Sequence, residues 1–243
     1  MLSIFNKNKT YITKKGFTLA EVLITLTIIG VVAAMIIPTV INNAQDKQFK
    51  AMFKKEYSSL AQTLQMMYAK DGESLALLNS INSNNFWQMS SFVCRMGKEL
   101  KYVKSGLICT SDNLNMGSNM SKNEDVSWHK TGEWFNKKKE PMSLNIGYVN
   151  YTFLMLDGAL INFNCLKTVF IDVNGYKKPN TVGRDIFYFR LKQDNLAPIF
   201  FDGDSVNVNG CSAPYNTLIT KENYKEDCET GSGWGCSPLY IIE

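Results

Sequence analysis

Residues 14–41 read KKGFTLAEVLITLTIIGVVAAMIIPTVI. A short basic leader ends at Gly16, and about 25 almost entirely apolar residues follow it. A helix of ~20 apolar residues is long enough to cross the hydrocarbon core of a bilayer. One acid, Glu21, lies near the start of the apolar run, where a charge costs ~3 kcal/mol on insertion scales. The stretch therefore predicts a membrane-spanning helix whose single acid has a specific task.

The residues on either side of Gly16 form a junction of a known kind. Phe17 follows Gly16 directly, and Glu21 is the fifth residue after the glycine. The pattern resembles the class III signal of type IV pilins and type II secretion pseudopilins. The other residues that match it are Lys14, Lys15, Thr18, Leu19, Gly30 and Pro38. The resemblance covers roughly the first 70 residues and is only architectural beyond them.

The resemblance implies a processing route and a mode of assembly. A prepilin peptidase is expected to cut between Gly16 and Phe17 and to methylate the new amino group of Phe17. The apolar helix then packs with its copies in a filament, and Glu21 pairs with the amine of a neighbouring Phe17. The expected function is that of a structural subunit of a type IV pilus or a type II secretion pseudopilus, and the signal does not distinguish the two. Expected partners are the peptidase, other pilin-like subunits, the inner membrane and its assembly platform.

Two other kinds of N-terminal segment fit the sequence less well. An ordinary secretory signal has an apolar region of about 7–15 residues that ends at a small-residue cleavage site. Ala33 and Ala34 imitate such a site, but the apolar run continues beyond them through Ile37. A plain signal anchor does not account for Gly16–Phe17 followed by Glu21.

The charge distribution predicts the topology of the chain. The formal charge of +4 comes entirely from the four lysines that precede Gly16, and the remaining chain has 22 basic and 22 acidic residues. Lysines on the N-terminal side of an apolar span tend to stay in the cytoplasm. The chain beyond Ile41 is therefore expected outside the cytoplasm, first anchored in the inner membrane and then in a surface filament or periplasmic pseudopilus. A neutral mature chain also gives no reason to expect nucleic-acid binding.

All six cysteines lie beyond the apolar segment. An even number of cysteines in an exported domain favours disulfides, although six allow 15 complete pairings. Cys228–Cys236 is preferred because it closes a short glycine-rich loop, Cys94–Cys109 comes next, and Cys165–Cys211 follows by elimination. The sequence has no C-x-x-C and one histidine, His129, so a zinc site of the usual type is not expected.

The helix is expected to continue beyond the membrane. Apolar residues recur at helical spacing on one face, with lysines on much of the remainder, and Asp71–Gly72 provides a stop. The apolar stripe consists of Phe49, Met52, Phe53, Leu60, Leu64 and Met67. The predicted organisation is a leader over 1–16, an assembly helix over 17–41, its amphipathic continuation over 42–71, and an exported head over 72–243.

The head is expected to be an α+β domain with the long helix packed on an antiparallel sheet of about four strands. Residues 151–156 and 159–164, joined at Asp157–Gly158, predict a hairpin, and residues 168–173 and 186–191 predict two more strands. Residues 74–103 suggest one or two short helices, residues 110–143 suggest a surface loop that contains the basic run Asn136–Lys139, and residues 203–238 suggest a disulfide-stapled loop.

The loop between the last two predicted strands has two interpretations. Asp172, Asn174, Asn180 and Asp185 offer oxygen atoms of the kind that calcium prefers, and some major pseudopilins carry a calcium loop in this part of the sheet. Lys177, Lys178 and Arg184 lie in the same segment, and its spacing is not that of an EF-hand. An ordinary turn stabilised by Asx hydrogen bonds is the alternative.

No catalytic set is visible in the sequence, and an enzyme is not expected. His129 has no evident nucleophile as partner, and neither a phosphate-binding loop nor an H-E-x-x-H motif is present. Two other functions remain open for the same anchor. One is a binding subunit at a filament tip, either an adhesin or a DNA-uptake receptor, and the other is a membrane-anchored exported enzyme.

Overall fold

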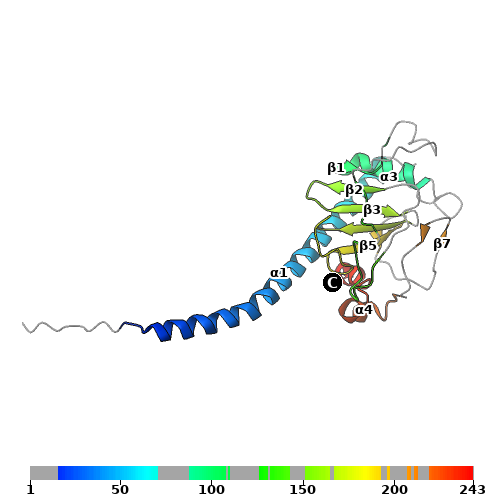
Figure 1. Cartoon of the computed structure of the whole chain (residues 1–243). Coiled ribbons are helices and arrows are strands. Elements are labelled where there is room, and N and C mark those ends of the chain that lie inside the picture. The colour runs from blue at the N-terminus through cyan, green and yellow to red at the C-terminus, as the bar shows by residue number, and fades with distance from the viewer. Residues whose placement is uncertain are drawn as a thin grey trace, which may run out of the picture. The chain divides into compact units, whose positions relative to one another are not determined.

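The computed structural model describes residues 16–70, 88–107, 109, 126–130, 132–142, 151–164, 167–192, 196–197, 207–208, 211–212 and 219–242. The chain divides into two compact units, Met1–Gln45 and Asp46–Glu243 (Figure 1). The predicted leader up to Lys15, Cys165 and the side chain of Cys211 lie outside the described residues.

One helix, α1 (Leu19–Lys70), belongs to both units. Its 52 residues correspond to ~78 Å at 1.5 Å per residue. The apolar first part has a mean hydropathy of 2.5 and is not buried by the chain, so α1 is long and apolar enough to cross a membrane. α1 runs through Pro38 and is described as far as Lys70, and the predicted stop at Asp71–Gly72 lies outside the described residues. The predicted helix is therefore confirmed over Leu19–Lys70.

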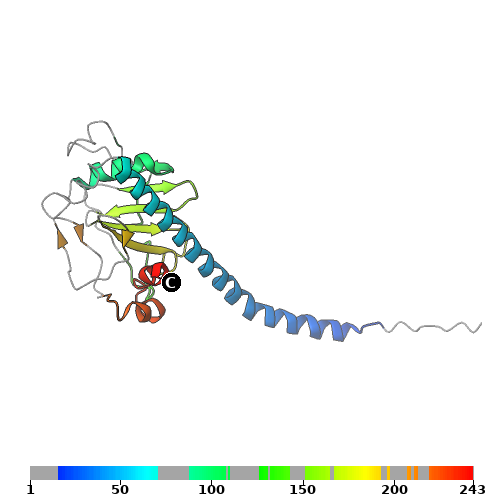
Figure 2. The same ribbon diagram turned by 180° about the vertical axis from the view of Figure 1, so that it is seen from behind.

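The second part of α1 packs on the sheet through the predicted apolar stripe. Its buried residues are Phe49, Phe53, Glu56, Leu60, Thr63, Leu64 and Met67. The ring of Phe53 stacks on that of Phe187 with centroids 4.2 Å apart, and Tyr57 meets Phe189 edge-on at 5.5 Å. Figure 2 shows this part of α1 crossing the face of the sheet. Helical periodicity thus identified the buried face of α1, but it did not predict that the acid Glu56 is buried there.

The sheet is antiparallel, with the strand order β1-β2-β3-β4-β5-β6. Its four inner strands are the predicted ones: β2 (Thr152–Met155), β3 (Leu160–Asn164), β4 (Thr168–Asp172) and β5 (Ile186–Leu191). Gly158 adopts a φ of 92° in the β2–β3 turn, which a residue with a side chain rarely tolerates. Two edge strands were not predicted, β1 (Tyr102–Ser105) and β6 (Leu196–Ala197). A second ladder pairs β7 (Asn207–Val208) with β8 (Cys211–Ser212).

Both faces of the sheet are covered. Alternate residues of β4 and β5 belong to different clusters: Val169 and Phe187 face α1 and the short helix α3 (Gln88–Glu99), whereas Phe170 and Tyr188 face the opposite side. That second cluster is dominated by three buried tryptophans, Trp128, Trp134 and Trp234. The interpretation of residues 110–143 as surface loop is therefore wrong for Trp128 and Trp134, which cover this face, but it holds for the exposed turn at residues 138–140.

The C-terminal region contains two helices, α4 (Tyr224–Thr230) and α5 (Cys236–Ile242), rather than the loop that its composition suggested. The predicted disulfides Cys228–Cys236 and Cys94–Cys109 are both present.

The side chain of Asp227 holds the connection between α4 and α5 through hydrogen bonds. One carboxylate oxygen of Asp227 accepts hydrogen bonds from the backbone N–H and the hydroxyl of Ser232 at 2.8 and 2.7 Å, and the other accepts from the N–H of Gly235 at 2.8 Å.

Candidate functional site

The predicted cleavage point lies at the start of α1. Gly16 and Phe17 precede the helix, and the Phe17 side chain is 88% exposed. Nothing lies within 4 Å of the position that a Cβ would occupy on Gly16. The peptide bond between these residues is therefore accessible in this unit.

Glu21 closes a capping box with Thr18. One oxygen of the Glu21 carboxylate accepts hydrogen bonds from the Thr18 backbone N–H at 2.8 Å and from its hydroxyl at 2.7 Å. The backbone N–H of Glu21 donates in return to the Thr18 hydroxyl oxygen at 3.2 Å. This reciprocal pattern satisfies donors that a helix N-terminus otherwise leaves free. The Thr-x-x-Glu spacing of residues 18–21 is the sequence signal for this capping box, but it was not used to predict one.

The surface that follows Glu21 is apolar on all sides. No charged residue occurs between Glu21 and Asp46, and the large side chains of this stretch are exposed. They include Val22, Leu23, Ile24, Leu26, Ile28, Ile29, Val31, Val32, Met35, Ile36, Ile37, Val40 and Ile41. A helix that is hydrophobic all round needs lipid or other apolar helices as its surroundings.

Comparison with known proteins assigns this segment. Residues 13–37 match the prokaryotic N-terminal methylation motif. That motif is the signature of the prepilin-type signals of type IV pilins and pseudopilins. No curated protein and no solved structure matches the chain. The prepilin-type signal thus includes Gly16, Phe17, Glu21 and the first part of α1.

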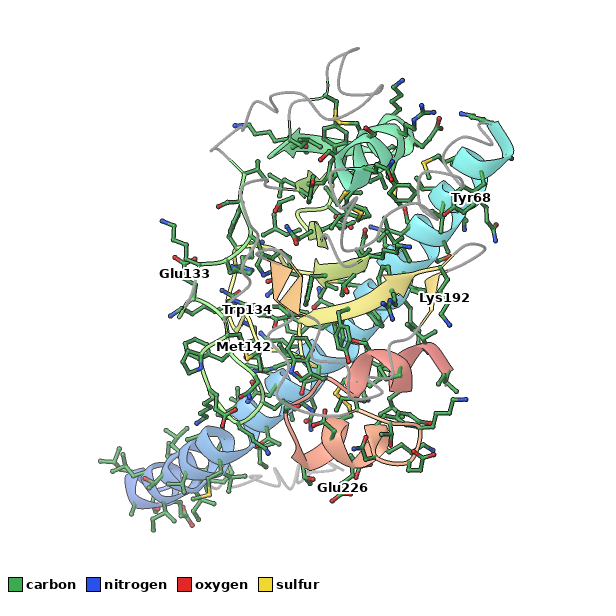
Figure 3. All side chains as sticks on the ribbon, turned by 90° about the vertical axis from the view of Figure 1, so that its right-hand side faces the viewer. Tyr68, Glu133, Trp134, Met142, Lys192 and Glu226 are labelled. Atoms are coloured by element: carbon green, nitrogen blue, oxygen red, sulfur yellow. A yellow bond between two sulfur atoms is a disulfide. The ribbon has the colours of Figure 1, made fainter. Side chains whose placement is uncertain are left out.

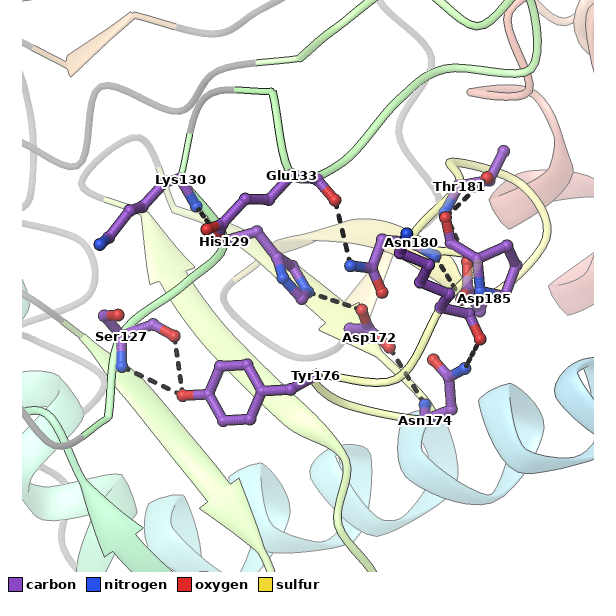
Figure 4. Close-up of polar contacts among 12 residues, drawn as sticks. Ser127, His129, Lys130, Glu133, Asp172, Asn174, Tyr176, Asn180, Thr181 and Asp185 are labelled. Atoms are coloured by element: carbon purple, nitrogen blue, oxygen red, sulfur yellow. Dashed lines mark hydrogen bonds and ion pairs between the residues drawn. The ribbon is translucent and has the colours of Figure 1, made fainter.

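The residues of the predicted calcium loop gather beside the ends of β4 and β5 (Figure 4). Asp172 and Asp185 are fully buried. One Asp172 oxygen lies 2.7 Å from Nε2 of His129, and the other accepts from the Asn174 backbone N–H at 3.1 Å. The two Asp185 oxygens accept from the backbone N–H groups of Asn180 at 2.8 Å and Thr181 at 2.6 Å. Each of the four carboxylate oxygens thus has a hydrogen-bond partner within the protein.

The two asparagines of the loop are used on one side only. The side-chain amides of Asn174 and Asn180 donate to the backbone oxygens of Lys178 at 3.1 Å and of Glu133 at 3.0 Å. Their Oδ1 atoms are buried and have no hydrogen-bond partner among the described residues. Across those residues, no group of three or more His, Cys, Asp or Glu side chains is arranged to hold a metal ion.

Burial shapes the electrostatics of this loop. It raises the pKa of Asp172 to about 7, against the lowering effect of the hydrogen bond from His129. Burial also raises the pKa of Asp185, although backbone donors from Thr181 and Asn180 oppose the shift. Two buried carboxyl groups close to each other disfavour the doubly charged state. The loop can lower this cost through protonation, through His129, or through a bound cation.

His129 was left without a partner by the sequence, and the structure supplies Asp172. Both side chains are buried, so the pair ties the segment that contains Trp128 to the end of β4. Tyr176 strengthens the same connection, because its hydroxyl accepts from the Ser127 N–H at 3.2 Å and donates to the Ser127 carbonyl at 3.0 Å. Within the described part of the chain, no hydrogen bond joins His129 to a Ser, Thr or Cys side chain. The arrangement is that of a structural link.

Proposed function

We propose that the chain is a pilin-like structural subunit that is made as a precursor. A prepilin peptidase cuts between Gly16 and Phe17 and methylates the amine of Phe17. The observation that carries this proposal is the methylation motif over residues 13–37, which includes the first part of an apolar helix that the chain itself does not bury. No enzymatic role is part of the proposal.

Assembly proceeds through the first part of α1. Its apolar surface leaves the bilayer only if other apolar helices replace the lipid. Glu21 then exchanges Thr18 for the amine of a neighbouring Phe17, so its charge is compensated and each subunit is set in register with the next. Type IV pili and type II secretion pseudopili both use this signal, so the proposal covers both.

The proposed topology is a single pass through the inner membrane. Residues 1–16 are the leader, 17–41 the span, 42–71 the amphipathic continuation, and 72–243 the head outside the cytoplasm. The disulfides Cys94–Cys109 and Cys228–Cys236 support this topology, because disulfides persist in oxidising compartments.

Processing is tested by the mass of the mature N-terminus. The full chain is expressed in bacterial membranes with and without a prepilin peptidase, and its intact mass is measured. With the peptidase we expect a chain that begins at N-methyl-Phe17. Without it, or with Gly16→Leu, we expect the full-length precursor, still inserted in the membrane. An N-terminus near Ala34 would identify an ordinary secretory signal instead.

For the 172–185 loop we propose that its own hydrogen bonds close it, with calcium binding as the competing hypothesis. The occupied carboxylate oxygens favour the first, and the unpartnered Oδ1 atoms of Asn174 and Asn180 favour the second.

Thermal unfolding of the full chain in detergent separates these two hypotheses. We expect the same melting temperature with calcium and with a chelator, since no backbone N–H donor has to be displaced. Saturation of a site at 100 times its dissociation constant would instead stabilise the protein by ~2.7 kcal/mol. A calcium-dependent rise that Asn180→Ala abolishes would establish calcium as a ligand.

A further inference from the structure

The head contains a cationic pocket of about 540 Å³. It is formed by the start of the α1 segment that belongs to the head, the turn at 136–140, the loop before β5, and α5. The lining side chains that matter here are Asp46, Lys137, Lys139, Arg184 and Tyr240. Three cations and one acid thus face the same cavity.

The four charges differ in how they are held. Nε of Arg184 lies 2.7 Å from Oδ1 of Asp46, and both side chains reach solvent. The ammonium group of Lys137 donates to the carbonyl of Cys228, and burial lowers its pKa. Asp227 and Glu229 also act on Lys137, but Asp46 is the acid that lines the pocket. Lys137 is therefore structural, whereas Lys139 and Arg184 can meet an incoming anion.

Lys139 is presented by a closed turn. The Asn136 backbone N–H donates to the Glu140 carbonyl at 3.0 Å, and the Glu140 N–H donates to Oδ1 of Asn136 at 2.9 Å. Lys139 itself has a φ of 65°, a left-handed conformation that glycine or asparagine adopts at lower cost. Its side chain is exposed at the pocket.

An aromatic ring, that of Tyr240, also lines the pocket, and a further cation lies over this ring. The ammonium group of Lys50 lies 4.4 Å from the centroid of the Tyr240 ring. Tyrosine is enriched where proteins meet the headgroup layer of a membrane, because its ring is apolar and its hydroxyl is polar. Basic and aromatic groups thus share one cavity.

One residue that lines the pocket follows the predicted membrane span closely in the sequence. Asp46 is the fifth residue after Ile41, and both belong to α1. Five residues of helix advance by ~7.5 Å. The headgroup layer on each side of the hydrocarbon core is ~5–8 Å thick. If the span ends at Ile41, as the proposed function requires, Asp46 lies at the level of the phosphates or just beyond them.

We propose that this pocket binds the phosphodiester headgroup of an anionic phospholipid in the leaflet that faces the head. Arg184 exchanges the Asp46 carboxylate for a phosphate, because its planar guanidinium group can donate two hydrogen bonds to a phosphate. Lys139 adds a second positive charge. The contact orients the head on the membrane before assembly. It is released when the subunit is drawn out of the bilayer.

The test measures lipid selectivity of the full chain in nanodiscs. Spin-labelled phosphatidylglycerol and phosphatidylcholine are compared by electron paramagnetic resonance, which reports how much of each lipid is immobilised by the protein. Because Lys139 and Arg184 both line the pocket and Arg184 gives up its pair with Asp46, we expect phosphatidylglycerol to be preferred about tenfold. The double variant Lys139→Gly with Arg184→Gln removes both charges, and glycine adopts the left-handed backbone conformation of position 139 at lower cost. We expect it to abolish the preference for phosphatidylglycerol.

Lys177→Gln with Lys178→Gln is the matched control. It removes the same charge from exposed positions of the head that do not line the pocket. We expect it to leave the preference unchanged. Equal losses in both double variants would indicate diffuse surface attraction and would overturn the proposal. Near-ultraviolet circular dichroism of the buried tryptophans confirms that each variant is folded.

Two further arms separate the remaining outcomes. Soluble glycerol phosphate is added to nanodiscs of phosphatidylcholine alone. If this anion binds the pocket as strongly as phosphatidylglycerol does, the ligand is a soluble anion and the lipid proposal is overturned. Membrane insertion and the mass of the mature N-terminus are measured on the same samples. Failure there refutes the proposed function, whereas correct insertion without lipid selectivity refutes only this inference.

Discussion

Glu21→Ala is expected to be inserted and cleaved normally but to lose filament assembly. In a bundle of apolar helices the Phe17 amine would remain as an unpaired cation. Breaking a buried ion pair by removal of one partner costs ~3–5 kcal/mol. Since each 1.4 kcal/mol is a factor of ten in an equilibrium, filament yield is expected to fall by more than about a hundredfold. Quantitative shearing of filaments, with the mature mass of the membrane-bound subunit, measures both steps.

The capping box of the isolated chain provides the control for this experiment. Glu21→Ala also removes the bond to Thr18, so a helix-capping defect alone could weaken the subunit. Thr18→Ala breaks the same cap, at a cost of ~0.5–2 kcal/mol, but leaves the acid available for the amine. We expect Thr18→Ala to assemble nearly normally and Glu21→Asp to be intermediate. Equal defects in Glu21→Ala and Thr18→Ala would assign Glu21 to capping rather than to pairing between subunits.

Glu56→Gln is expected to stabilise the head above neutral pH and to leave it unchanged near pH 4.5. Glu56 is 3% exposed, on the face of α1 that packs on the sheet. Burial and a hydrogen bond with Asp157 raise its pKa from 4.5 to about 7. Lys55 lies beside both acids, with its ammonium group 3.3 Å from the Glu56 carboxylate. The folded state thus holds a proton on Glu56 that the unfolded state releases.

The direction of the pH effect follows from this difference. Below pH 4.5 Glu56 is protonated in both states, so it contributes no pH dependence. Between pH 4.5 and about 7 only the unfolded state releases its proton, and the free energy of unfolding falls as the pH rises. The raised pKa values of Asp172 and Asp185 act in the same sense. The variant is therefore compared with the wild type at each pH.

Glutamine can donate to Asp157 as protonated glutamate does, without the cost of a buried charge. At pH 8 we expect Glu56→Gln to be more stable by up to about 3 kcal/mol, because one pKa unit corresponds to 1.36 kcal/mol. Denaturant unfolding of the full chain in detergent, followed by tryptophan fluorescence, gives this difference. Glu226→Gln, on the outer surface of α4, is the matched control and should leave the pH profile unchanged (Figure 3). If the difference in the free energy of unfolding between wild type and Glu56→Gln does not change with pH, Glu56 does not keep its proton in the folded state.

The predicted elements that the structure confirms rest on local patterns. The apolar run indicated the first part of α1, the Gly16–Phe17 junction indicated the prepilin-type signal, alternation indicated β2 to β5, and the stripe from Phe49 to Met67 indicated the face of α1 that packs on the sheet. These features depend on neighbours two to four residues apart, which the sequence displays directly. Cys228–Cys236 belongs with them, because its two cysteines are only eight positions apart in the sequence.

What the sequence by itself determined is therefore the long apolar helix, the prepilin-type signal, the inner strands of the sheet and the short disulfide loop. Only the tertiary structure decided that Trp128 and Trp134 cover the second face of the sheet and that His129 meets Asp172. It also decided that burial and Asp157 raise the pKa of Glu56 and that Lys139 and Arg184 line one pocket. These pairs are 43 to 101 residues apart. Periodicity shows that a side chain will be buried or exposed on its own element, but not which distant segment will complete its surroundings. That depends on how the whole sheet is covered.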